Sequence, residues 1–532
     1  MSKKSFLKGA AILGVAGLLV QVMGAIFRIP LGNIIGDEGM GYYQTAYPIY
    51  VFLLVFSTNG APAAISKMTS ERIAIGRNDE AHRVFKLSFI LMFILGIVAS
   101  AIFFFGAGPI VEALGNPGAY YAMISIAPAL LFVPIMAVFR GYFQGMQEMG
   151  PTATSQLIEQ AVRVAIGLAL AVMWVPKGLE VAAAGATVGT SIGPVIGVLV
   201  LVIIYLIRKR NLPLKNSSKT LHRESSASIL KTLAAIAIPI TIGVSVLPIM
   251  NVADVIIVMR RLQSIGFSGD EANALYGQLT GMAGPVINLP MALALSMALS
   301  MVPAIAAAAS TKDTAFLNLN VRLGLRTAMI IGVPCSFGLM ALSEPIMKLL
   351  YPMQAESAVS ASGCLFFLAL GIVFLCIAQT MAGTLQGLGK PGIAVWGLAA
   401  GFIVKCISTY MLCGMPELNV EGAAIGSTLG YITIGLINFA AVKKITGIKF
   451  DISLSIWKPV ISGFVMFILV IGSYKLLYGV IGNSLSTVVS IGIGAAVYGI
   501  MLLKIKAIEE HEIVMLPKGT ALVKALKKFR LV

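Results

Sequence analysis

Apolar runs of about twenty residues follow one another along the chain, separated by short polar turns. A run of that length crosses a hydrocarbon core of about 30 Å as an α-helix. The pattern therefore predicts an all-α polytopic membrane protein with about fourteen transmembrane helices. The expected spans are 9–35, 42–65, 84–106, 119–144, 153–174, 181–207, 229–259, 272–309, 323–342, 357–385, 391–412, 421–442, 459–478 and 484–503.

Several short motifs occur twice and in the same order. "IGDEGMGYY" from Ile35 is matched by "SGDEANALY" from Ser268, and "GATVGTSIG" at 185–193 is matched by "GAAIGSTLG" at 422–430. The second and eighth spans also correspond, because each is interrupted by prolines. A duplication accounts for this order. It predicts two six-helix repeats, helices 1–6 and 7–12, related by an axis along the membrane normal and followed by two C-terminal helices.

This organisation divides the chain into five parts. A basic polar linker separates the repeats, and a basic amphipathic cytoplasmic tail, suited to lie on anionic lipid, ends the chain. The expected parts are an N-terminal six-helix bundle (1–207), the linker (208–228), a C-terminal six-helix bundle (229–442), helices 13 and 14 (443–505), and the tail (506–532).

The repeated Gly-Asp-Glu segments fall between spans 1 and 2 and between spans 7 and 8. We therefore interpret them as the turns of one duplicated hairpin on the outer side of the membrane. Gly36 and Gly269 are expected to end or bend a helix there. Tyr43 and Tyr276 are expected to lie at the membrane interface as anchors.

Composition supports the membrane assignment and explains the charge. Hydrophobic residues make up 58% of the chain, charged residues 11%, and the mean hydropathy is +0.93. The net charge is +17, but most of the 39 Lys and Arg fall in alternate loops and in the two termini. This distribution follows the positive-inside rule and predicts that both termini are cytoplasmic. No nucleic-acid partner is needed to account for the basic charge.

The sequence offers no hydrolytic, metal or phosphate-cleaving site. The stretch "GTLQGLGKP" at 383–391 has the wrong spacing for a P-loop. The five cysteines lie in or beside apolar spans without metal-ligand spacing, and the three histidines lie in segments expected to be cytoplasmic. We therefore expect no enzyme activity, no metal and no cofactor, with coupling to the membrane potential or to a H⁺ or Na⁺ gradient as the energy source.

Polar side chains at membrane depth are the candidates for function, because they are costly there and usually face a cavity or a partner helix. Arg28 in span 1 either faces a cavity or snorkels to the interface. The uncharged groups either bind a substrate or form helix–helix hydrogen bonds. The expected substrate-binding residues are Arg28, Asn59, Asn251, Asp254, Arg260, Arg261, Gln278 and Asn288.

Three further charged residues lie inside spans. Glu159 and Arg163 are spaced i,i+4 in span 5, which predicts an ion pair that is either structural or involved in coupling. Lys405 in span 11 has no obvious partner in the sequence, and its role is structural or functional.

Spans 2 and 8 help to choose among these residues. Proline- and glycine-interrupted spans at corresponding positions of two repeats mark the binding site in many transporters. We therefore expect a central cavity lined by spans 1, 2, 7 and 8. Arg28 would then be the partner for an anionic group of the substrate.

The sequence also resembles a known family. "FLKGAAILGVAGLLVQVMGAIFRIPLGNIIGDEGMGYYQTAYPIY", "NGAPAAISK" and "FRGYFQGMQEMGPTATSQLIEQAVR" resemble the stage V sporulation protein B branch of the polysaccharide transporters. That group belongs to the multidrug/oligosaccharidyl-lipid/polysaccharide exporter superfamily, beside the MurJ-type lipid II flippases. The stretches "STNGAP" in span 2 and "QLTGMAGP" in span 8 lack the cavity arginines that Gram-negative flippases of this kind carry there.

The resemblance implies a flippase of the bacterial cytoplasmic membrane that moves an undecaprenyl-diphosphate-linked saccharide, preferentially lipid II, by alternating access. It implies two bundles that rock, with Arg28 facing the cavity. From the MurJ-type members it also implies that helices 13 and 14 (443–505) are a candidate groove for the lipid tail. Expected partners are the lipid-linked substrate, anionic lipids and cell-wall synthesis proteins, and the chain is expected to be a monomer. A multidrug/cation antiporter of the same superfamily and a non-transporting scaffold of cell-wall synthesis are the alternatives.

Overall fold

The computed structural model describes residues 3–209, 224–311 and 313–507, and every regular element in these ranges is helical. By its internal contacts the chain divides into two compact units, Met1–Gly281 and Met282–Val532. This division is made by contacts and not by sequence repeats, so the expected domain boundaries stay predictions. Most of the linker and nearly all of the C-terminal tail lie outside the described residues.

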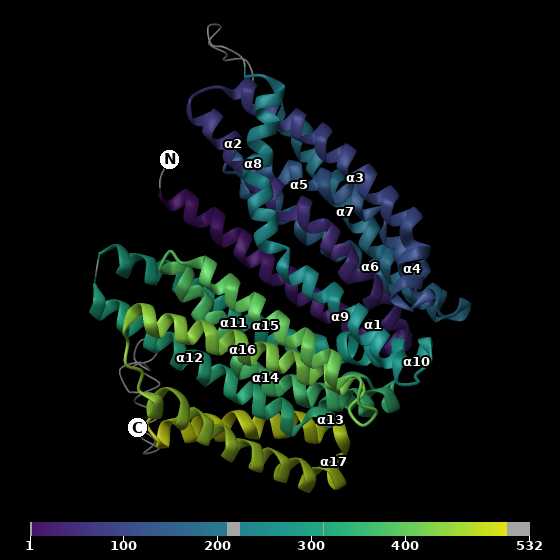
Figure 1. Ribbon diagram of the computed structural model, residues 1–532, viewed down its shortest axis with the longest axis vertical. Coiled ribbons are helices and arrows are strands. Elements are labelled where there is room, and N and C mark those ends of the chain that lie inside the picture. Colours follow the sequence, from purple (N-terminus) through teal and green to yellow (C-terminus); the bar gives the residue numbers. More distant parts are fainter. Residues whose placement is uncertain (1–2, 210–223, 312, 508–532) are drawn as a thin grey trace. The chain divides into compact units, whose positions relative to one another are not determined.

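The first unit contains ten α-helices among its described residues. Figure 1 shows α3, α5 and α7 side by side. The elements are α1 (Lys3–Val55), the π-helix η1 (Phe56–Gly60), α2 (Ala61–Ala74), α3 (Asn78–Leu114), α4 (Tyr120–Ile126), α5 (Ala129–Gly145), α6 (Met149–Trp174), α7 (Leu179–Lys209), α8 (Ser226–Val244), α9 (Val246–Ser264) and α10 (Gly269–Gly277).

The second unit is also helical throughout the part that the structure describes. The π-helix η4 (Gln278–Ala283) leads into it. Its elements are α11 (Gly284–Ser310), α12 (Thr314–Ala341), α13 (Ser343–Leu350), α14 (Ala355–Gly387), α15 (Pro391–Leu412), α16 (Glu421–Thr446), the π-helix η5 (Ser453–Trp457) and α17 (Lys458–Lys504).

The helix α1 is a hairpin that folds back at Gly36, where φ is 68° and ψ is −171°. The rings of Phe27 and Tyr43 lie 6.3 Å apart. In an unbroken helix these two residues would be separated by about 24 Å, at about 1.5 Å per residue. Only glycine adopts this backbone conformation without strain, which explains why the bend falls at Gly36.

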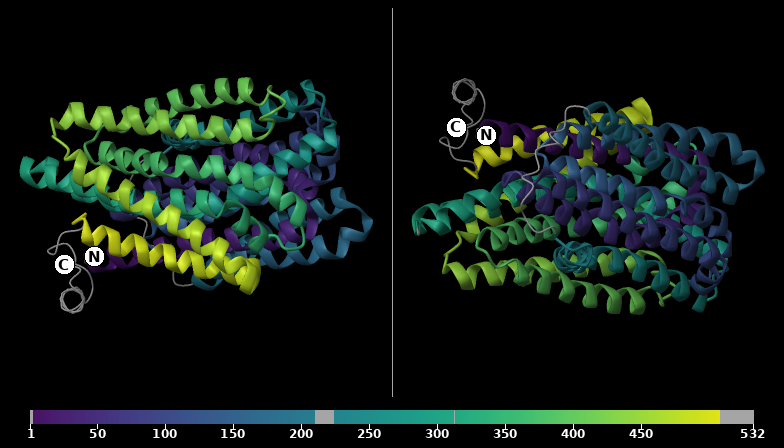
Figure 2. Two further views of the ribbon diagram at one scale, coloured as in Figure 1. Left: turned by 90° about the horizontal axis from the view of Figure 1, so that it is seen from below. Right: turned by 90° about the horizontal axis from the view of Figure 1, so that it is seen from above.

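The helix α17 doubles back in the same way at Gly482, where φ is 71°. The hydroxyl of Ser473 donates to that of Ser490 at 3.1 Å, and Lys458 Nζ donates to the Lys506 carbonyl at 2.9 Å. Figure 2 shows the two arms of this yellow hairpin. Both bends fall where the hydropathy pattern separates spans 1 and 2 and spans 13 and 14.

Twelve described helical stretches are long and apolar enough to cross a membrane, and both hairpins are among them. The chain is therefore a multi-span, all-α membrane protein, as predicted. The number of fourteen crossings and the six-helix repeats stay predictions.

Span 7, expected as one helix over 229–259, is instead divided into α8 and α9 at Ser245. Pro248 has no N–H to donate to the Val244 carbonyl, and its ring would clash with that group. The helix therefore ends at Val244. The Ser245 hydroxyl donates to the Thr241 carbonyl at 2.7 Å, which also accepts the Ser245 N–H at 3.0 Å. Back-bonding of this kind by serine often bends a helix.

Spans 2 and 8 are interrupted by π-helical stretches, and of the expected prolines Pro62 lies in the first turn of α2, just after the first stretch. The stretch η1 covers "FSTNG" and η4 covers "QLTGMA", while Pro48, Pro290 and Pro303 lie inside α-helices. Single π-helical turns are rare and occur frequently at functional sites. Span 8, expected as one helix over 272–309, is thus α10, η4 and α11.

The two glycine motifs form close helix–helix contacts, each within its own unit. Gly185, Gly189 and Gly193 of α7 face α6, where a Cβ on Gly193 would lie 2.9 Å from the Glu159 carbonyl oxygen. Small residues four apart let membrane helices approach closely. In the second unit α16 packs on α15 in the same manner, and a Cβ on Gly430 would lie 3.1 Å from the Cβ of Lys405.

We predict that Gly36→Ala destabilises the protein and weakens its function, because alanine at this φ is strained by about 1–3 kcal/mol. The apparent melting temperature of the detergent-purified protein should fall by several degrees. Gly17→Ala is the matched control, since Gly17 lies in the same helix and a Cβ added there would meet no atom within 4 Å. Equal melting temperatures for the two variants would contradict the role of Gly36.

Candidate functional site

The first unit carries a cation beside a stack of tyrosines on the two arms of the α1 hairpin. The guanidinium carbon of Arg28, on the first arm, lies 5.8 Å from the centre of the Tyr47 ring on the second. The Tyr47 ring stacks on Tyr43 at 5.5 Å and lies 5.9 Å from Tyr50. A guanidinium over an aromatic face is stabilised by the ring quadrupole. The bend at Gly36 creates this site because it brings the two arms together.

Glu159 lies between two arginines in the same unit. Its Oε1 is 3.3 Å from Nη2 of Arg163, so the i,i+4 pair is present. Its Oε2 is 2.8 Å from Nη2 of Arg140 in α5, and the Nε of Arg140 also donates to the Ser155 hydroxyl at 3.0 Å. The side chains of the three charged residues are only 13–15% exposed.

These two groups belong to one neighbourhood. Arg163 lies within electrostatic range of Tyr43, Tyr47 and Tyr50, and Arg28 also acts on Tyr43. Gly189 and Gly193 of α7 pack on the backbone of Arg163 and Glu159, and this close contact holds α6 against α7 beside the tyrosines. We call Arg28, the three tyrosines and the Arg140–Glu159–Arg163 cluster the arginine–tyrosine site.

Sequence reasoning misses part of this site. Arg140 falls inside the expected span 119–144, and the structure places it in α5, but it is not among the expected site residues. Tyr43, Tyr47 and Tyr50 follow the spacing of one helical face, which is the available signal. The role of interfacial anchors expected for Tyr43 and Tyr276 is wrong, because both side chains are only 2% exposed and pack inside the protein.

The repeated Gly-Asp-Glu segments contact each other directly in the first unit. The Tyr42 hydroxyl donates to Glu38 at 2.9 Å and lies 3.4 Å from the Asp270 carboxylate of the second copy. Gln278 Nε2 donates to Asp37 at 2.7 Å. Gln278, expected to bind substrate, is thus buried in the contact between α1 and α10.

The bend in the second copy differs from the expectation. Gly269 begins α10 behind the cap of Ser268, whose hydroxyl accepts from the Glu271 N–H at 3.2 Å. The glycine with positive φ in this turn is Gly266, at 109°. Gly36 bends its helix as expected, whereas Gly269 starts one.

The other expected substrate-binding residues of the first unit lie on α9 and η1. Asn59, Asn251 and Arg260 are exposed, and Arg260 Nε donates to the Ala113 carbonyl of α3 at 3.1 Å. Arg261 donates to the Ser264 hydroxyl at 3.1 Å. The half-buried Asp254 acts electrostatically on Tyr276. Of the expected set, the structure thus brings Arg28 to the arginine–tyrosine site.

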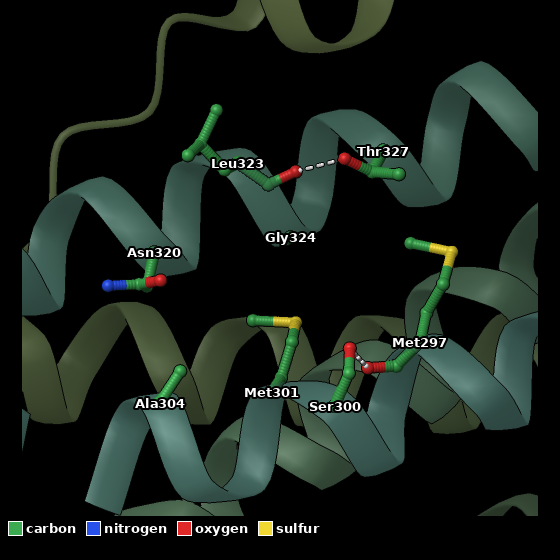
Figure 3. Close-up of a pocket in the computed structure, with 8 residues that line it drawn as sticks. All are labelled: Met297, Ser300, Met301, Ala304, Asn320, Leu323, Gly324 and Thr327. Carbon is green, nitrogen blue, oxygen red and sulfur yellow. Dashed lines mark hydrogen bonds between the residues drawn. The ribbon is translucent and has the colours of Figure 1, made fainter. Parts of the chain in front are cut away.

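Asn288 and Lys405 belong to the second unit. Both are half-buried, and the stem of Lys405 packs on Gly430 of α16. This unit also has a pocket of about 220 Å³ between α11 and α12. Figure 3 shows that Met297, Met301 and Asn320 line it, and that its Ser300 and Thr327 hydroxyls bond to backbone carbonyls. With no charged side chain among its lining residues, the pocket does not suit an anionic ligand.

No group of histidine, cysteine or acidic side chains suited to a metal occurs among the described residues. Cys364, Cys376 and Cys413 are buried as small apolar residues, while Cys335 and Cys406 are half-buried. His82 stacks on Phe85 and Tyr205. The chemistry that the described site offers is the binding of anions by guanidinium groups and hydroxyls.

Comparison with known proteins agrees with this architecture. The fold is similar to a solved structure described as lipid II flippase MurJ in an inward closed conformation, with a TM-score of 0.67 and 17% identity, covering 92% of this chain and 97% of that one. Stage V sporulation protein B of Bacillus subtilis is 27% identical over 526 residues, covering 97% of this chain and 98% of that protein. Lipid II flippase MurJ of the same organism is 27% identical over 468 residues, covering 85% of each chain.

The fold thus defines a multi-span helical membrane protein with the architecture of the MurJ structure. Residues 6–309 match the family described as Polysaccharide biosynthesis protein, and residues 278–411 match the family described as MatE. The chain belongs to the polysaccharide biosynthesis protein family.

We predict that Glu159→Gln destabilises the fold, because it leaves Arg140 and Arg163 without their shared counter-charge. Removing one partner of a buried ion pair costs about 3–5 kcal/mol. Thermal unfolding of the purified protein should show a clear fall in melting temperature. Glu71→Gln is the matched control: Glu71 lies 3.9 Å from Lys67 with both side chains about 60% exposed, so its loss should change little. Similar effects of both substitutions would show that the cluster is not structural.

Proposed function

We propose that this protein is a flippase that translocates a lipid-linked saccharide across the bacterial cytoplasmic membrane, with both termini cytoplasmic. The observation that carries the proposal is the arginine–tyrosine site, in which Arg140 and Arg163 share the Glu159 carboxylate and Arg28 lies over the Tyr47 ring, on helices of the first unit that are long and apolar enough to cross a membrane. Membership of the polysaccharide biosynthesis protein family and the similarity to a lipid II flippase support it.

In this proposal the excess positive charge attracts the diphosphate that joins the sugar to its lipid. The Arg28 guanidinium can donate two parallel hydrogen bonds to a phosphate, while the ring of Tyr47 holds it in place from the other side. The tyrosine rings offer flat surfaces on which a sugar ring can rest. Alternating access then carries the head group across while the polyprenyl tail stays in lipid, with the α17 hairpin as the candidate groove for the tail.

We propose lipid II as the preferred substrate, because the relatives that match almost the full chain or most of it include stage V sporulation protein B and lipid II flippase MurJ. The arginines absent from "STNGAP" and "QLTGMAGP" are replaced, in this view, by Arg140 and Arg163 from neighbouring helices. The coupling source in this proposal is the membrane potential or an ion gradient.

The antiporter alternative needs a carboxylate that is able to exchange protons or Na⁺. Two guanidinium groups already hold Glu159, and their positive charge repels a further cation. Asp254 is the remaining candidate, so drug efflux that depends on Asp254 without lipid-linked transport would favour this alternative. A scaffold without transport would show no translocation at all.

We predict that Arg28→Ala lowers translocation of labelled lipid II in proteoliposomes at least tenfold while the protein remains folded, since one charge-assisted contact is worth about 1.5–3 kcal/mol. Arg28→Lys should retain part of the activity, because it keeps the charge and loses the planar fork. Lys67→Ala, at an exposed position, is the control.

Full activity of Arg28→Ala would move the binding site away from Arg28. Wild-type protein that moves neither lipid II nor any related lipid-linked sugar, under every tested membrane potential and ion gradient, would contradict the flippase itself. Complementation of cells depleted of their lipid II flippase, scored beside spore-cortex formation, tests the substrate in vivo.

A further inference from the structure

Two hydrogen-bond donors near the Tyr50 end of the tyrosine stack, which we call its inner end, have no acceptor among the described residues. Tyr50 is 1% exposed, and its hydroxyl makes no hydrogen bond within the described part of the chain. The Nε of Arg163 is likewise buried and without an acceptor in that part. The two residues lie within electrostatic range of each other. Buried polar groups are almost always satisfied, so this pair points to an acceptor that binds between them.

The charge of the site specifies what kind of acceptor fits. As defined, the site holds three guanidinium groups and the one carboxylate of Glu159, which leaves an excess of two positive charges. A diphosphate esterified at both ends carries one ionised oxygen on each phosphate. Such a group would therefore neutralise the site and supply several acceptor oxygens at once.

Arg163 is also the arginine that is able to change partner. Arg140 is fixed by two side chains, Ser155 at 3.0 Å and Glu159 at 2.8 Å, whereas the contact of Arg163 with Glu159 is longer, at 3.3 Å. If Arg163 turned to another anion, Glu159 would keep Arg140 as its counter-charge. The cluster can therefore release Arg163 without leaving a buried carboxylate unpaired.

Building on the proposed function, we propose that Tyr50 and Arg163 form the inner half of a two-part diphosphate site. One phosphate binds Arg28 at Tyr47. The other reaches the inner end of the stack, where it accepts hydrogen bonds from Arg163 and from the Tyr50 hydroxyl and replaces Glu159 as the partner of Arg163. Glu159 then acts as a stand-in anion that holds Arg163 when no substrate is bound.

The test uses the full-length purified protein with inorganic pyrophosphate as the probe and sodium sulfate at equal ionic strength as the reference. Pyrophosphate should stabilise the wild type against heat in a saturable manner, which gives an apparent Kd. Tyr50→Phe removes one buried oxygen and should weaken that Kd about tenfold, as expected for loss of a hydrogen bond to a charged group. Arg163→Lys keeps the charge, loses Nε, and should weaken binding to a similar extent.

Tyr498→Phe is the matched control. Tyr498 of α17 is also buried, at 6% exposure, with a hydroxyl that makes no hydrogen bond among the described residues, but it belongs to the second unit and not to the arginine–tyrosine site. Its loss should leave the pyrophosphate response unchanged. Tyr50→Phe keeps the ring and so preserves the test even if Arg163→Lys fails to fold.

The outcomes separate this inference from the flippase proposal. Pyrophosphate binding that depends on Tyr50 and Arg163, in a protein that moves no lipid-linked sugar, would support the inner site and contradict the proposed transport. Arg28-dependent translocation with wild-type pyrophosphate affinity in both variants would overturn the inner site while the flippase stands. A wild type that responds to pyrophosphate no more than to sulfate would also overturn it.

Discussion

The cost of keeping guanidinium groups at membrane depth governs the construction of the first unit. An unpaired charge there is costly, and each of the three arginines is held by a specific device. Arg28 lies over an aromatic ring because α1 folds back on itself, while Arg140 and Arg163 share Glu159. The glycines of α7 let that helix pack closely on the backbone of Arg163 and Glu159.

These contacts neutralise only part of the positive charge of the three arginines. The remaining positive charge is the link between the structure and the proposed activity. A fully neutralised cluster would be a structural element with little reason to bind an anion. A cluster with an excess of donors is stable enough to fold and still favours a ligand that completes it. In the second unit, glycines pack α16 on α15 in the same way. The aliphatic part of the Lys405 side chain lies against Gly430 there, where the first unit has a cluster of arginines. The chemistry of the two units is therefore unequal.

Much of the fold follows from the sequence, because span length, the hairpin bend at Gly36 and the glycine motifs are local features. The division of span 7 at Ser245 can also be predicted from the sequence, because Pro248 removes a backbone donor. The hydropathy pattern alone does not show this division. The site is less predictable. The pair of Glu159 and Arg163 is local, whereas Arg140 reaches it from another helix, and tyrosines are apolar enough to be taken for interfacial residues. Contacts between distant segments depend on how helices pack, which one sequence does not specify.

The contact between the two Gly-Asp-Glu segments has a consequence for how the chain can change over time. Tyr42 of the first segment hydrogen-bonds to Glu38 beside it and reaches Asp270 of the second, and Gln278 bonds back to Asp37. Segments that serve as each other's binding surface cannot vary independently, because a substitution in one removes a partner of the other. If the two halves arose by the predicted duplication, most of each was free to diverge, whereas this contact was held by mutual constraint. Such a constraint would explain why the two Gly-Asp-Glu segments still resemble each other in sequence.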